Sequence, residues 1–163
     1  MAYAIVRTDK MFGTQNKAGL THFKFFDAED KAADIENGNV VEIDGLLEGA
    51  REVYKAAAPK ATSEKKNILL VADPEVVVEK KYNGLGEFIN KADEVVRGYY
   101  LHTNDIFSVT DEALDGEAAV GKFVELQADT KLKVADAAGD ATIGKVIAIE
   151  QAGRIKYNVI QVA

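Results

Sequence analysis

The stretch from residue 120 to residue 162 constrains the fold most, because it consists almost entirely of short strand-like segments. In the first of them Val124, Leu126 and Ala128 alternate with Glu125 and Gln127. A period of two is typical of a strand with one face on a core and one face in water. Turn-forming residues separate the segments, which span 120–128, 131–134, 142–150 and 154–162. This stretch therefore predicts a compact antiparallel meander or small barrel. The residues expected to be largely buried in it are Val124, Leu126, Val134, Val146, Ala148, Tyr157 and Val159.

A second run of strand signals begins at Gly38 and resembles the first. Residues 38–45 match residues 121–128 position for position in hydrophobicity, with Glu42 at the place of Glu125. Two further pairs of segments match in the same order, 51–58 with 131–138 and 68–72 with 146–149. We interpret 38–72 and 121–150 as an internal strand duplication, with chance similarity between short β-patterns as the alternative.

The length of 163 residues suits one domain. We expect residues 38–163 to form a mainly β domain and residues 1–37 to form an N-terminal arm and an acidic loop. The aromatic residues Phe23, Phe25 and Phe26 either complete the core or dock on another subunit. The acidic loop does not fit a calcium-binding EF-hand, because Lys31 and Ala32 stand where a ligand and a glycine are needed.

One helix is predicted, from Gly86 to Val96, since Phe88, Ala92 and Val95 recur at spacings of four and three. Residues 97–107 predict a strand, and residues 73–78 carry both helix-start and strand signals. The expected fold is thus mainly β, a small antiparallel β-barrel or sandwich with one or two short helices.

Composition limits the classes of function. A hydrophobic fraction of 47% and a charged fraction of 29% are typical of soluble globular proteins, and no apolar run is long enough for a membrane span. The N-terminus carries no secretory signal pattern, so we expect synthesis in a cytoplasm. The net charge of −7 opposes binding to phosphate backbones. We therefore expect neither a membrane nor a nucleic acid as partner.

Few residues could carry chemistry. The chain has two histidines and no cysteine. The sharpest catalytic set would join His102 to Ser108 and to Asp105 or Asp111, yet a strand would hold His102 and Ser108 about 20 Å apart. We therefore expect no enzyme, no metal and no other cofactor. A small enzyme or ligand-binding β-barrel that uses His102 and nearby carboxylates is the alternative.

Between residues 38 and 162 the chain resembles the auxiliary head proteins of tailed bacteriophages. The resemblance rests on residues 39–44, 100–110, 144–150 and 159–162. It implies a virion structural protein, a capsid decoration or cement protein, that binds the major capsid protein and neighbouring copies of itself. Such a protein lies on the capsid surface and is assembled in the host cytoplasm. Head-tail joining and tail-tube proteins are structural variants of this interpretation, and residues 73–97 depart from the smallest decoration proteins.

The resemblance carries over no catalytic residue. Aromatic and amide side chains are typical of interfaces, and they gather in two pieces of the chain. We interpret these pieces as contacts with the capsid or with another subunit; they contain Phe12, Gln15 and Asn16, and Tyr99, Tyr100 and His102.

Overall fold

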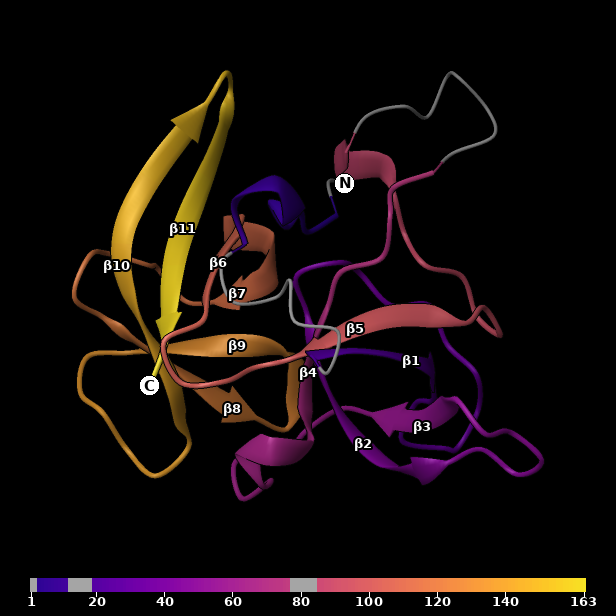
Figure 1. The fold of residues 1–163 in the computed structure, drawn as a ribbon. Helices are drawn as coiled ribbons and strands as arrows, with labels where there is room; N and C mark the ends of the chain where they lie inside the picture. Colours follow the sequence, from indigo (N-terminus) through magenta and orange to yellow (C-terminus); the bar gives the residue numbers. More distant parts are fainter. Residues whose placement is uncertain (1–2, 12–18, 77–84) are drawn as a thin grey trace.

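The computed structural model describes residues 3–11, 19–76 and 85–163, and in that part of the chain it is mainly β (Figure 1). It contains a closed five-stranded barrel and a separate six-stranded sheet. The predicted fold class is confirmed. The helical pieces are short 3-10 turns, η1 (Thr8–Lys10), η3 (Lys65–Asn67), η5 (Leu85–Glu87) and η6 (Asp111–Ala113).

The barrel has the strand order β1-β3-β2-β4-β5 and closes where β5 returns to β1. The closing pair is antiparallel and sets Leu20 opposite Tyr99, whereas β1 and β3 run parallel. The remaining barrel pairs are antiparallel. The strands are β1 (Leu20–Phe25), β2 (Val40–Leu46), β3 (Val53–Ala57), β4 (Ile68–Val71) and β5 (Val96–Tyr100).

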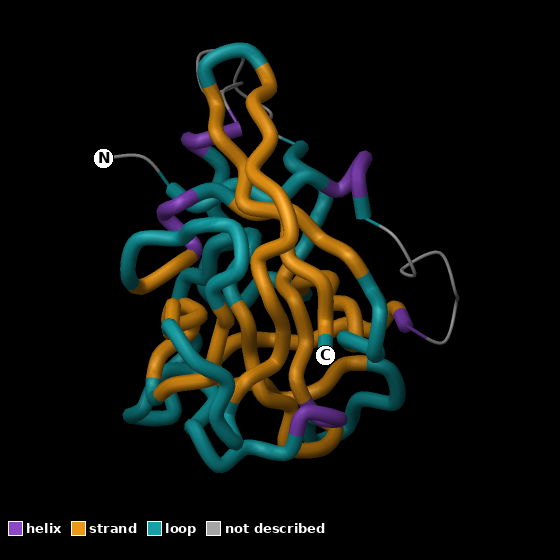
Figure 2. Tube along the Cα trace, turned by 90° about the vertical axis from the view of Figure 1, so that its left-hand side faces the viewer, coloured by secondary structure: helices purple, strands orange, loops and turns teal. Residues whose placement is uncertain are grey.

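The second sheet has the order β6-β11-β10-β8-β9-β7. Its two longest strands, β10 and β11, form a hairpin that extends beyond the rest of the sheet (Figure 2). The strands are β6 (Ile106–Val109), β7 (Leu114–Asp115), β8 (Phe123–Gln127), β9 (Asp129–Ala135), β10 (Thr142–Ala152) and β11 (Ile155–Val162).

The two sheets repeat one pairing order. The sequence β1-β3-β2-β4-β5 in the barrel has its counterpart in β7-β9-β8-β10-β11, and β7 runs parallel to β9 as β1 does to β3. Strand β6 pairs with β11 as the first half of β1 pairs with β5. The repeated order extends beyond the segments 38–72 and 121–150, whose common origin stays an interpretation.

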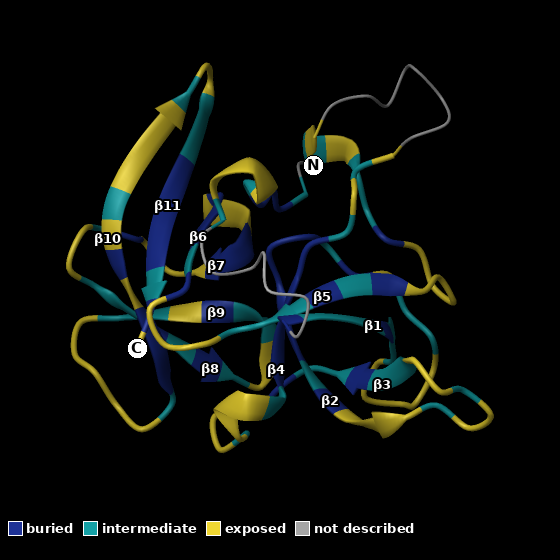
Figure 3. Ribbon diagram, in the orientation of Figure 1, coloured by how far each residue is buried: buried dark blue, intermediate teal, exposed yellow. Residues whose placement is uncertain are grey.

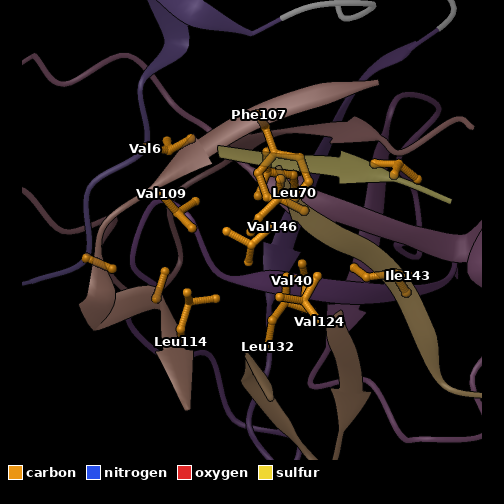
Figure 4. Packing of buried hydrophobic residues seen from close by; sticks show 14 of the residues in the cluster. Val6, Val40, Leu70, Phe107, Val109, Leu114, Val124, Leu132, Ile143 and Val146 are labelled. Carbon is orange, nitrogen blue, oxygen red and sulfur yellow. The ribbon is translucent and has the colours of Figure 1, made fainter. Parts of the chain in front are cut away.

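Two clusters of buried hydrophobic residues, the barrel core and the shared core, stabilise the sheets. The barrel core is built by residues from all five barrel strands, among them Phe23, Val41 and Leu69. The shared core joins the second sheet to the barrel and contains Val40 and Leu70 from the barrel side (Figure 4). Strand β4 is buried on both faces, because Leu69 and Val71 belong to the barrel core while Ile68 and Leu70 belong to the shared core.

The described residues of the N-terminal segment are part of this β structure. Ala4 and Val6 lie in the shared core, and Val6 forms a β-bridge with Val109 of β6. Phe23 is fully buried in the barrel core, and Phe25 packs against that core in part. Phe23 and Phe25 therefore belong to the core of their own chain, which was one of the two interpretations left open, whereas Phe26 is half-buried and forms a β-bridge with Ala32.

The prediction of a helix from Gly86 to Val96 is wrong beyond the short turn η5. Asn90 forms a β-bridge with Ile35, and its side chain is tied to the Ile35 carbonyl at 2.9 Å. Asp93 then takes a positive φ of 67°, which ends any right-handed helix. The tertiary hydrogen bonds of a buried asparagine thus determine the backbone conformation here, although the apolar residues have helical spacing.

The prediction of a continuous strand over residues 97–107 is also wrong. Strand β5 ends at Tyr100 and β6 begins at Ile106, with Asn104 between them at a φ of 73°. Asn104 donates its N–H to the Val162 carbonyl at 3.0 Å, so the turn is attached to the end of β11. The turn moves the chain from the barrel to the second sheet.

The alternation in the C-terminal stretch correctly predicts most of its buried side chains. Val124, Leu126, Val146, Tyr157 and Val159 are buried. Val134 and Ala148 were expected to be buried too, but each is half-buried, since Val134 packs at the margin of the shared core and Ala148 lies in the projecting hairpin.

Candidate functional site

His102 lies in the turn between β5 and β6, where it is paired with Asp105. The backbone N–H of His102 donates to Asp105 Oδ2 at 3.0 Å, and the backbone N–H of Asp105 donates to the His102 carbonyl at 3.0 Å. His102 Nδ1 is 3.5 Å from the same carboxylate oxygen. Asp105 is buried while the imidazole is 60% exposed. The carboxylate therefore shapes the turn and leaves the imidazole open to solvent.

The other members of the predicted catalytic set are used elsewhere. Ser108 is buried within β6, and its carbonyl accepts the N–H of Arg7 at 2.8 Å. The Asp111 carboxylate accepts hydrogen bonds from Lys156 at 2.6 Å and from Asn158 at 2.8 Å. Among the described residues no hydrogen bond joins His102 to Ser108. The structure thus does not assemble this set.

The two tyrosines predicted as contacts are half-buried and face different cores. Tyr99 packs against the shared core and Tyr100 against the barrel core, as expected for neighbours on one strand. Burial raises the pKa of Tyr100, and the charge and hydrogen bond of Tyr54 raise it further. Only part of each ring is accessible. Phe12, Gln15 and Asn16 lie outside the described residues.

A cavity of about 970 Å³ lies beside the barrel. It is bounded by the chain between β4 and β5 together with Tyr3 and with His22 of β1. Apolar walls alternate with charged groups, and the lining residues are Tyr3, His22, Asp73, Pro74, Val76, Glu87, Phe88, Ile89, Asn90, Lys91, Glu94, Val95 and Arg97. The sequence did not indicate this cavity, because residues 73–78 carry both helix-start and strand signals and residues 86–96 have helical spacing.

The polar groups of the cavity are mostly bound to the protein itself. Asp73 Oδ1 accepts the backbone N–H of Arg97 at 2.9 Å, and Lys91 Nζ donates to Asp34 Oδ2 at 3.0 Å. That lysine lowers the pKa of Asp34. The side chain of Arg97 differs, because its Nε is buried and has no hydrogen-bond partner among the described residues. The described lining contains no serine, threonine or cysteine, so the cavity is better suited to binding than to nucleophilic catalysis.

Residues 3–11, 19–76 and 85–163 contain no group of three or more histidine, aspartate and glutamate side chains placed to hold a metal ion. Within the same ranges no helix is both long enough and apolar enough to cross a membrane.

Comparison with models of protein families, with curated proteins and with solved structures finds no match to this chain.

Asp111→Ala should destabilise the protein by about 1–3 kcal/mol, since it leaves the buried Asn158 amide without its acceptor. Burial alone would raise the pKa of Asp111, but the hydrogen bonds from Lys156 and Asn158 outweigh it and lower the pKa. The ionised carboxylate thus stabilises the fold fully at pH values above its ordinary pKa, near 4. This contribution is lost as the pH falls through the lower pKa of the folded state. Urea unfolding at pH 7 and at acid pH measures both effects.

The matched control is Asp129→Ala, which changes an exposed aspartate whose hydrogen bonds go to the neighbouring Thr130. It should leave Asn158 and the residues around it unchanged. Equal losses of stability in the two variants at pH 7 would contradict the role given to Asp111.

Proposed function

We propose that the protein is a capsid decoration protein of a tailed bacteriophage, a virion structural protein that binds the major capsid protein and bridges its subunits. The sequence resemblance over residues 38–162 supports this proposal. One observation favours it over the enzyme alternative: the partners that His102 would need for catalysis are committed to structure. Asp105 shapes a turn, Ser108 is buried in a strand, and Asp111 holds β11.

The proposed mechanism is stabilisation by linkage. A ligand that binds the assembled shell and not its separated subunits shifts the equilibrium away from disassembly. If one copy contacts two or more shell subunits, several weak patches together give strong attachment. A compact β scaffold with a shared core suits this role, because it presents its surface loops in fixed positions.

His102 is the most accessible of the described residues predicted as capsid contacts. Its imidazole is 60% exposed, whereas Tyr99 and Tyr100 are half-buried. Residues 12–16 are the second proposed patch. Removing residues 1–19 would be a poor test of that patch, because it would also remove Ala4 and Val6 from the shared core. Substitution within the patch is the sharper experiment.

The test is to mix the purified protein with undecorated capsids and to measure co-sedimentation and the temperature at which the capsids disrupt. We expect saturable binding and a raised disruption temperature. His102→Ala and the triple change Phe12→Ala, Gln15→Ala, Asn16→Ala should weaken binding, whereas Lys66→Ala, an exposed residue of η3, should not. No binding to capsids, or binding to free capsid subunits only, would overturn the proposal.

A second candidate function is the binding of a small ligand, and the cavity beside the barrel favours it. Its volume of about 970 Å³ is ample for such a ligand, and His22 and Arg97 are among the residues that line it. This site would use His22 and Arg97 instead of His102. A thermal-shift screen of small molecules tests it, with Arg97→Leu expected to abolish any stabilisation. A screen in which no compound raises the melting temperature would remove this candidate.

A further inference from the structure

The projecting part of β10 has one edge without a strand partner among the described residues. Strand β10 pairs with β8 only from Thr142 to Lys145. Val146 extends this contact by two hydrogen bonds. Its N–H donates to the Lys122 carbonyl at 2.8 Å, and its carbonyl accepts the N–H of Gly121 at 2.8 Å. From Ala148 to Ala152 the strand pairs with β11 alone, and Ile147 is the extra residue where the register shifts between Val146 and Ala148. We call this stretch, residues 147–152, the free edge.

The free edge is apolar and open to solvent. Ile147 is 39% exposed and Ile149 is 43% exposed. Val120, which precedes the residue that is hydrogen-bonded to Val146, is 62% exposed. Figure 3 shows the outer half of β10 as exposed and the facing half of β11 as largely buried. An exposed apolar edge with unpaired backbone groups is a template for pairing with another strand.

The hairpin that carries the free edge is braced by its own chain. The Arg7 guanidinium lies 5.2 Å from the centre of the Tyr157 ring and 3.8 Å from the Glu150 carboxylate. On β11, Lys156 and Asn158 are tied to Asp111. The edge is therefore held in a fixed position before any partner arrives, which lowers the entropic cost of pairing.

We infer that the free edge binds a second copy of this chain, with two β10 strands antiparallel about a two-fold axis at Ile149. In a continuous sheet such an axis pairs each residue with one on the same face. An axis at Glu150 would oppose two carboxylates, which is unfavourable. An axis at Ala148 would place partner residues 150–152 against residues 144–146, which β8 already covers.

The axis at Ile149 opposes no two carboxylates, and it places only Ala152 of the partner subunit against a residue that is already covered, Val146. It pairs Ile149 with its own copy, Ala148 with Glu150 of the partner subunit, and Ile147 with Gln151 of the partner subunit. All these residues lie in the free edge, and no like charges stand directly opposite one another. This self-complementarity favours a second copy over an unrelated strand. The inference does not depend on capsid binding.

The sharpest test uses the absence of cysteine from the chain. In an Ile149→Cys variant the two sulfurs of a dimer would face each other across the axis, at a separation that suits a disulfide. We expect mild oxidation to convert most of this variant to a covalent dimer on a non-reducing gel. Leu46→Cys, an equally apolar and 49% exposed position on β2, is the control and should cross-link only slowly.

A second measurement needs no oxidation. Sedimentation equilibrium of the unmodified chain should show a dimer, and Ile149→Lys should raise the dissociation constant about tenfold or more by placing two ammonium groups together at the axis. Leu46→Lys should leave it unchanged, and circular dichroism checks that both variants fold. A monomeric unmodified chain, or equal cross-linking of the two cysteine variants, would overturn the inference. The inference would also be overturned if the unmodified chain is monomeric in solution and Ile149→Lys instead abolishes its binding to capsids.

Discussion

A chain carrying Val124→Asp should not fold. Val124 is fully buried on β8 and belongs to the shared core that joins the two sheets. An aspartate there would be an unpaired charge in a close-packed interior, at a cost of about 4–5 kcal/mol or more. That cost approaches the whole stability of a typical domain. The measurement is circular dichroism and the soluble yield of the purified variant.

Val120→Asp is the matched control, because it makes the same change four positions earlier, at a side chain that is 62% exposed. It should keep the stability of the unmodified chain within about 0.5 kcal/mol. A soluble Val124→Asp variant with unchanged stability would mean that β8 turns its other face to the core.

Gly144→Ala should destabilise the protein by about 3 kcal/mol or more. Gly144 lies in β10 between β8 and β11, opposite Val124 on one side and Val162 on the other. A Cβ at this position would stand 2.6 Å from the backbone oxygen of Gln161. Backbone atoms cannot rotate away as a side chain can, so the two strands would have to separate. Denaturant unfolding measures the loss.

Gly86→Ala provides the comparison, since its added methyl group would meet only the Ile5 side chain at 3.7 Å, an ordinary contact. We expect a small change in the free energy of unfolding for this variant. Similar losses in both variants would show that the close approach of β10 to β11 is not what requires glycine at position 144.

The strands were predictable where local alternation and tertiary burial agree. In β8 the polar Glu125 separates Val124 from Leu126, and the two apolar side chains are the buried ones. Closure of the barrel was not predictable, because it depends on the pairing of Leu20 with Tyr99, residues far apart in sequence. Nothing in the local pattern of either strand specifies that partner.

The errors lie where polar side chains determine the backbone. Phe88, Ala92 and Val95 have helical spacing, yet the hydrogen bonds of Asn90 to residues 35 and 37 hold that segment against the barrel. The cavity was missed for the same reason, since its wall is this irregular segment. The signal that could have revealed it is Asn90 itself, an asparagine amid apolar residues, a residue type that favours turns over helix interiors.

Strand β4 has a consequence for how the molecule unfolds. Its alternate residues belong to the barrel core and to the shared core, so this one strand contributes side chains to both cores. Separating the sheets would expose Ile68 and Leu70 to water, together with the residues they pack against on the other side. Neither half can lose its structure without removing support from the other. The two sheets should therefore melt in one cooperative transition, despite the repeated strand order that makes them look like separable units.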